Sequence, residues 1–113
     1  MKQKNVLVAI AVKSESLKSE IESCFGKAEY FFIADMDKKK YEFRKNPGSC
    51  IKENSGKKAA HFLLQLGVRC VISYNFGATV KNIFDRNNVQ IVMISDKYKY
   101  LNEIKWIGKF KSE

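Results

Sequence analysis

Three cysteines and a single histidine are the side chains of this sequence best suited to hold a metal. Cys24 stands directly before Phe25, and Cys50 follows a Pro-Gly turn, so we expect both thiols in loops. Soft thiolate ligands of this kind can hold an iron–sulfur species. Neither cysteine belongs to a Cys-x-x-Cys motif, and spacing alone favours two ordinary loop thiols. Cys70 lies inside an apolar run, which predicts a buried structural thiol.

The residues needed for enzymatic catalysis are not arranged in any familiar motif. There is no Walker loop, no Gly-x-Gly-x-x-Gly and no His-Glu-x-x-His. His61 falls on the polar side of an expected helix, where a solvated side chain is favoured over a metal ligand or a proton carrier. Asp35 and Asp37 flank a hairpin turn and do not form an acid/base pair. A thiol nucleophile at Cys24 is the weakest alternative, since Lys27 is the only basic residue near it in sequence.

Length and charge restrict the class of protein. The chain has 113 residues, 45% of them hydrophobic and 29% charged, and we expect one folded domain over residues 1–113. Its net charge of +9 favours acidic partners, whether nucleic acid, an anionic protein face or an anionic cofactor. No apolar run approaches the ~18 residues of a membrane span, and none resembles a signal peptide. We therefore expect a cytoplasmic protein with reduced cysteines and no membrane association.

The hydrophobic pattern predicts strands that alternate with helices. The continuous apolar run 6–12 is typical of a strand that is buried on both faces and therefore central. Further strands are expected at 30–34, 41–44, 68–72 and 90–94, and helices at 55–66, at 77–88 and after a cap at Ser95 or Asp96. The order β-β-β-α-β-α-β-α predicts an α/β fold, a mixed five-stranded sheet with helices packed on it. The basic tail after Trp106 is expected to fray.

This strand order brings four connections to one edge of the sheet. They are residues 13–29, 45–55, 73–77 and 95–97. Each follows the carboxyl end of one of the strands that run in the same direction. Open α/β sheets usually bind ligands at this edge. Three helices should begin there, and their unpaired N–H groups would suit an anion. Cys24 and Cys50 both map to it, and the turn at 73–77 either offers N–H groups to the anion or is a plain strand-to-helix turn.

The sequence also resembles a known family. Residues 17–33, LKSEIESCFGKAEYFFI, are similar to a signature that reads Leu-x-Ser, a gap, then His-Phe-Gly-Arg-Ala-x-Tyr-Phe. Asn46-Pro47, Leu66-Gly67-Val68 and Phe76-Gly77-Ala78 fit later parts of the same pattern. The pattern is that of the dinitrogenase iron–molybdenum cofactor biosynthesis family, which includes NifX-like carriers and domains like the C-terminal domain of NifB. The resemblance extends from residue 5 to about residue 97.

The resemblance implies a ribonuclease H-like motif fold without enzymatic activity. It implies a carrier that binds an anionic iron–sulfur or iron–molybdenum cluster, or its precursor, and exchanges it transiently with a donor or acceptor protein. Cys24 stands where the family usually has histidine, and Cys50 lies in a loop that is often rich in glycine and histidine. The implied cofactor-binding residues are Cys24, Phe25, Gly26, Cys50, Phe76 and Gly77, with Cys24 and Cys50 as the metal ligands.

The main alternative is a basic interaction module that binds nucleic acid or an acidic protein. The charge of +9 supports this alternative, whereas the loop cysteines support only the carrier. The lysines are scattered along the chain, which weakens the case for nucleic acid. We expect at most weak, non-specific binding to nucleic acid, with a steep dependence on salt.

Overall fold

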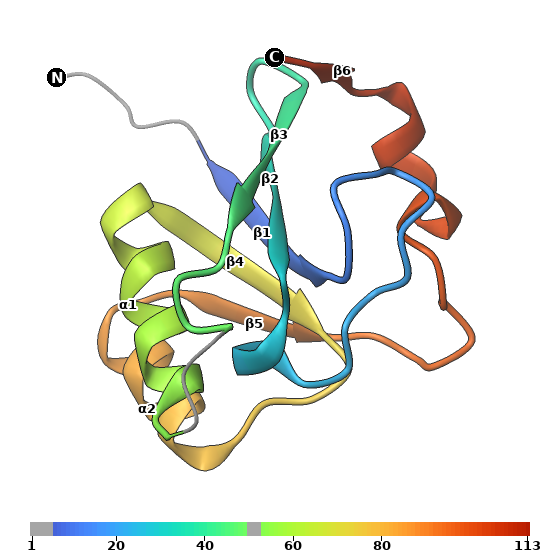
Figure 1. The fold of residues 1–113 in the computed structure, drawn as a ribbon. Helices are drawn as coiled ribbons and strands as arrows, with labels where there is room; N and C mark the ends of the chain where they lie inside the picture. Colours follow the sequence, from blue (N-terminus) through green and yellow to red (C-terminus); the bar gives the residue numbers. More distant parts are fainter. Residues whose placement is uncertain (1–5, 50–52) are drawn as a thin grey trace, which may run out of the picture.

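A computed structural model describes residues 6–49 and 53–113. Its strands are β1 (Leu7–Val12), β2 (Tyr30–Asp35), β3 (Lys40–Lys45), β4 (Val68–Ser73), β5 (Gln90–Met93) and β6 (Lys111–Ser112). They form one mixed sheet in the order β5-β4-β1-β2-β3-β6 (Figure 1). Strand β1 pairs antiparallel with β2 and parallel with β4, so the central position predicted for the run 6–12 is confirmed.

Two α-helices and a short 3-10 helix cover one face of the sheet. They are α1 (Ser55–Leu66), α2 (Ala78–Arg86) and η1 (Phe25–Lys27). In Figure 1 both α-helices lie on the same side of the sheet and begin at the same end of it, near η1. Their buried residues pack with inward-facing residues of β1 and β2 in a core that includes Phe25, Phe31, Leu63, Val80 and Phe84.

The opposite face of the sheet is covered mainly by irregular structure. The connection 13–24 and two 3-10 helices, η2 (Leu101–Glu103) and η3 (Lys105–Lys109), lie over it. A second core forms there around Ile10, Phe32, Leu101 and Ile107, all fully buried. Burial on both faces explains why the central strand β1 has a continuous apolar sequence.

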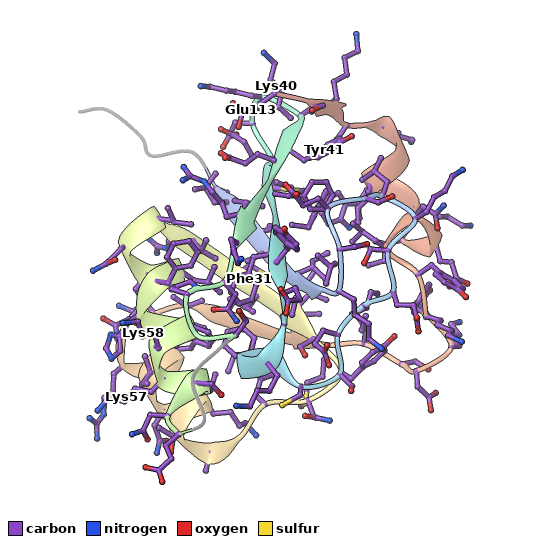
Figure 2. All side chains as sticks on the ribbon, viewed as in Figure 1. Phe31, Lys40, Tyr41, Lys57, Lys58 and Glu113 are labelled. Carbon is purple, nitrogen blue, oxygen red and sulfur yellow. The ribbon has the colours of Figure 1, made fainter. Side chains whose placement is uncertain are left out.

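The prediction of five strands is wrong, because the tail after Trp106 adds a sixth. The Lys111 N–H of β6 donates to the Lys39 carbonyl at 3.1 Å, and the N–H of Glu113, just after β6, donates to the Tyr41 carbonyl at 3.0 Å. Figure 2 shows Lys40, Tyr41 and Glu113 together at this end of the sheet. A polar strand of two residues has no hydrophobic period, so sequence pattern cannot reveal it.

The predicted third α-helix after Ser95 or Asp96 is also wrong. Residues 99–101 instead bond to the connection 13–24: the Ile21 N–H donates to the Lys99 carbonyl at 2.9 Å, and the Leu101 N–H to the Ser19 carbonyl at 2.8 Å. The Glu103 carboxylate accepts hydrogen bonds from the backbone N–H groups of Lys99 and Tyr100, at 2.9 and 2.7 Å. These contacts take the backbone groups that a longer helix would need, and only the short η2 and η3 form.

Across the described ranges, no helix is both long and apolar enough to cross a membrane.

Candidate functional site

The predicted ligand-binding edge of the sheet is formed by the carboxyl ends of β1, β3, β4 and β5 and by the start of the antiparallel strand β2. Val12, at the end of β1, lies opposite Tyr30 in the register of the sheet, and Tyr30 lies opposite Lys45 at the end of β3. The ends of β4 and β5, Ser73 and Met93, are also paired with each other. Helices α1 and α2 both begin at this edge, so it has two α-helical N-termini where three were expected.

The first turns of α1 and α2 are in direct contact. A methyl group at Gly56 would lie 2.9 Å from Cγ2 of Val80, so the absence of a side chain at Gly56 allows the two turns to meet. A shallow groove of about 290 Å³ lies between the two turns. It is lined by the segments 54–57 and 77–80.

Neither helix has a side-chain cap or an acidic residue in its first turn, and Glu53 directly precedes the N-cap of α1. The N-cap residues are Asn54 and Gly77. The N–H groups of Ser55, Gly56, Lys57, Ala78, Thr79 and Val80 have no hydrogen-bond partner among residues 6–49 and 53–113. Unpaired N–H groups and the partial positive charge of two helix dipoles therefore face one groove, which suits an anion.

The Phe25-Gly26 pair packs beside the first turn of α1. A methyl group at Gly26 would lie 2.4 Å from the backbone nitrogen of Gly56, so η1 rests directly on the helix backbone. The ring of Phe25 is only 5% exposed and lies 5.8 Å from that of Phe76, which precedes the start of α2. The structure thus brings Phe25, Gly26, Phe76 and Gly77 to the two helix N-termini. Phe25 is a core residue there, and it positions neighbouring backbone without offering an exposed face.

Asn46 holds this arrangement from the other side, a role that was not predicted from the sequence. Its side chain is 1% exposed, and its Nδ2 donates to the carbonyls of Gly26 and Ala28 at 3.1 and 2.9 Å. Its Oδ1 accepts the N–H of Gly48 at 2.8 Å. The side chain therefore ties η1 to the turn that follows β3. The Asn-Pro pair shared with the family pattern was the one available signal.

The cysteines occupy different environments. Cys24 is exposed at the N-cap of η1, two residues before Gly26, and its N–H donates to Oε2 of Glu22 at 3.1 Å. Cys50 lies outside the described residues. Cys70 is half-buried in β4, where the sequence predicted full burial, and desolvation raises the pKa of its thiol. Cys24 alone among the described cysteines is thus exposed at the candidate edge.

Comparison with known proteins identifies the family of this chain. A family model described as dinitrogenase iron-molybdenum cofactor matches residues 6–104. The chain belongs to this family. A search of curated proteins finds no match.

Solved structures of other proteins share the fold of this chain. The apo form of the orange protein from Desulfovibrio gigas matches with a TM-score of 0.77 at 14% identity, over 90% of this chain and 85% of that one. The NMR structure of a Thermotoga protein described as a NifB protein of the DUF35 family matches with a TM-score of 0.72 at 23% identity. That match covers 87% of this chain and 82% of the other.

Among the described residues, the side chains that could bind a metal are dispersed. Within the two described stretches, no group of three or more His, Cys, Asp or Glu residues is placed to hold a metal ion. His61 is exposed on the outer side of α1, where it lines a different groove. The described part of the edge therefore offers two helix N-termini and one exposed thiol, that of Cys24, which does not line the groove but lies two residues before the Gly26 that packs on α1.

Proposed function

We propose that this protein is a non-enzymatic carrier of an anionic iron–sulfur or iron–molybdenum-type cluster, or of its precursor. The observation that carries the proposal is the meeting of two uncapped α-helix N-termini in one groove. In this proposal the cluster lies over the first turns of α1 and α2, with Cys24 as a ligand and Cys50 as a second one. Phe25, Gly26, Phe76 and Gly77 keep the two turns in place.

Physical chemistry supports an anionic cargo at this groove. Each helix N-terminus carries roughly half a positive elementary charge, and acidic side chains that would offset it are absent from both first turns. Backbone N–H groups that are already oriented can donate to cluster sulfides or oxo groups without reorganising. A thiolate is a soft ligand that suits iron and molybdenum–sulfur species. The cargo would then be held by charge and a few ligands, which suits transient binding.

Family membership supports the same proposal. The family is named for the dinitrogenase iron–molybdenum cofactor, and the orange protein with the same fold has an apo form. We propose in addition that the fold is of the ribonuclease H-like motif type and that the protein acts in the cytoplasm. In that setting it would receive its cluster from one protein and give it to another.

Removal of the Cys24 thiol is expected to weaken cluster uptake. Anaerobic titration with a synthetic iron–sulfur cluster, followed by absorbance and metal analysis, measures the uptake directly. Cys24→Ala should take up less than wild type, and Cys50→Ala should show a smaller loss. Cys24→His should largely preserve uptake, because imidazole is also a metal ligand and histidine is usual at this position of the family pattern.

Cys70→Ala is the matched control for this titration. Its thiol lies within the sheet and its pKa is raised by burial, so its removal should leave uptake intact. It should instead lower the free energy of unfolding by about 1 kcal/mol, as is usual for a small side chain in a partly buried position. If the double variant Cys24→Ala, Cys50→Ala takes up as much cluster as wild type, or if wild type takes up none, the proposed ligands are wrong.

A further inference from the structure

A second and larger groove lies between the end of β3 and the outer side of α1. Its volume is about 630 Å³. It is lined by Lys45, Pro47, Glu53, Asn54, Lys57, Lys58, His61, Phe62 and Gln65. Figure 2 shows Lys57 and Lys58 on the side of α1 that faces away from the sheet. Most of these residues have no part in the proposed cluster site, so the groove is a candidate for a separate binding role.

The charge of this groove is strongly positive. Lys45, Lys57 and Lys58 line it against one carboxylate, that of Glu53. In the part of the chain that the structure describes, the ion pairs are Lys13–Glu20 and Glu42–Arg44, so none of the three lysines is neutralised by an ion pair.

The positions of Lys57 and Lys58 are costly for the helix. Both lie in the first turn of α1, where the partial positive charge of the helix disfavours cations. Adjacent lysines at a helix N-terminus lower helix stability, so local folding does not explain them. An anionic partner would offset this repulsion, which indicates a role in binding.

The shape of the groove fits an extended segment. Lys57, His61 and Gln65 follow one another at intervals of four residues and span about 12 Å along the helix at ~1.5 Å per residue. Phe62 and Pro47 supply an apolar surface, and the ring of Phe62 is stacked on that of buried Phe31 at 6.4 Å. A compact anion would leave most of this length uncovered.

The neighbouring edge of β3 also suits an extended partner. Strand β6 pairs only with Lys40 and Tyr41, so the outer edge of β3 from residue 42 to Lys45 has no strand partner within the described ranges. Unpaired backbone groups at a sheet edge can bond an added strand. Lys45 is the residue at which this edge reaches the groove.

We propose that this groove binds an extended acidic segment, with at least one apolar side chain, of a partner protein. Its carboxylates would contact Lys45, Lys57 and Lys58, and its apolar side chain would pack on Phe62 and Pro47. Asn54 and Lys57 line both this groove and the groove between the helix N-termini. The segment would therefore lie beside the proposed cluster site. That the partner donates or accepts the cluster rests on the proposed function.

The test is fluorescence anisotropy of cluster-free protein with a labelled peptide of glutamates and two leucines. Wild type should bind this peptide. Its affinity for a peptide with glutamine in place of glutamate should be lower by about tenfold or more. Lys57→Glu combined with Lys58→Glu should weaken binding of the acidic peptide by about tenfold or more. The same two substitutions should maintain or raise the melting temperature, because acidic residues suit a helix N-terminus.

The matched control is Lys105→Glu combined with Lys109→Glu, which makes the same change of net charge on exposed positions of η3. This control should bind the acidic peptide within a few-fold of wild type. Equal losses in both double variants would show that only net charge matters and would overturn the proposal. Tighter binding of a DNA duplex than of the peptide, or no binding of the peptide, would overturn it as well. Because no cluster is present, failure here is distinct from failure of cluster uptake.

Discussion

Gly26→Ala is expected to lower the free energy of unfolding by about 3 kcal/mol. The new methyl group would lie 2.4 Å from the backbone nitrogen and 2.7 Å from the Cα of Gly56. Both atoms belong to the first turn of α1, which cannot rotate away as a flexible side chain would. For a chain of this length the loss corresponds to a fall of roughly 10 °C in melting temperature, measured by circular dichroism.

Gly108→Ala is the control for this prediction. A methyl group at Gly108 meets nothing within 4 Å, so the same chemical change should alter the melting temperature by no more than a few degrees. A Gly26→Ala variant as stable as the Gly108→Ala variant would mean that η1 does not rest on α1 as described.

Asn46→Ala is expected to have an effect of similar size, about 3 kcal/mol. The substitution leaves the carbonyls of Gly26 and Ala28 and the N–H of Gly48 without the partners that they now have. Asn46→Asp should not rescue stability at neutral pH, since a carboxylate cannot donate to two carbonyls. Urea denaturation of both variants measures the loss.

The control for Asn46 is Asn82→Ala, an exposed position in α2. Its free energy of unfolding should stay within about 0.5 kcal/mol of wild type. If Asn46→Ala were equally harmless, the side chain of Asn46 would not be what ties η1 to the turn after β3.

Local signals in the sequence were sufficient to predict much of the fold. Helix α1 ends as expected at Leu66, because Gly67 adopts a left-handed conformation with φ of +86° and bonds back to the last turn. The central strand was predictable from its unbroken apolar run. The C-terminal region was not predictable, because its structure depends on hydrogen bonds between segments that are distant in sequence. Residues 99–101 bond to the connection 13–24, and β6 bonds to β3.

The sequence was sufficient to predict at which edge of the sheet the candidate site lies. It was not sufficient to predict the contacts between residues within the site. Strand order alone places the loops and helix N-termini together. Gly26 approaches Gly56, and Asn46 forms its hydrogen bonds, because of how the loops pack. Loop packing produces no periodic hydrophobic pattern from which it could be predicted. The basic groove was not predictable for a similar reason: it forms only where the fold brings Lys45 and Pro47 beside the polar side of α1.

If the two helix N-termini hold an anionic cluster as proposed, a negative charge placed at Thr79 should weaken its binding. Thr79 is exposed in the first turn of α2 and lines the groove between the helices. Thr79→Asp should stabilise α2 by about 0.5 kcal/mol, because a carboxylate suits a helix N-terminus. The same carboxylate should repel an anionic cargo. Thr79→Asn is a neutral control of similar shape, and Asn82→Asp adds the same charge farther along the helix.

The measurement is the metal bound per protein after anaerobic titration with the synthetic cluster, taken together with the melting temperature. We expect Thr79→Asp to bind the cluster about tenfold more weakly than wild type, while its melting temperature is unchanged or higher. Thr79→Asn and Asn82→Asp should bind it nearly as well as wild type. Equal binding by Thr79→Asp and Thr79→Asn would contradict the claim that the helix N-termini hold the cluster.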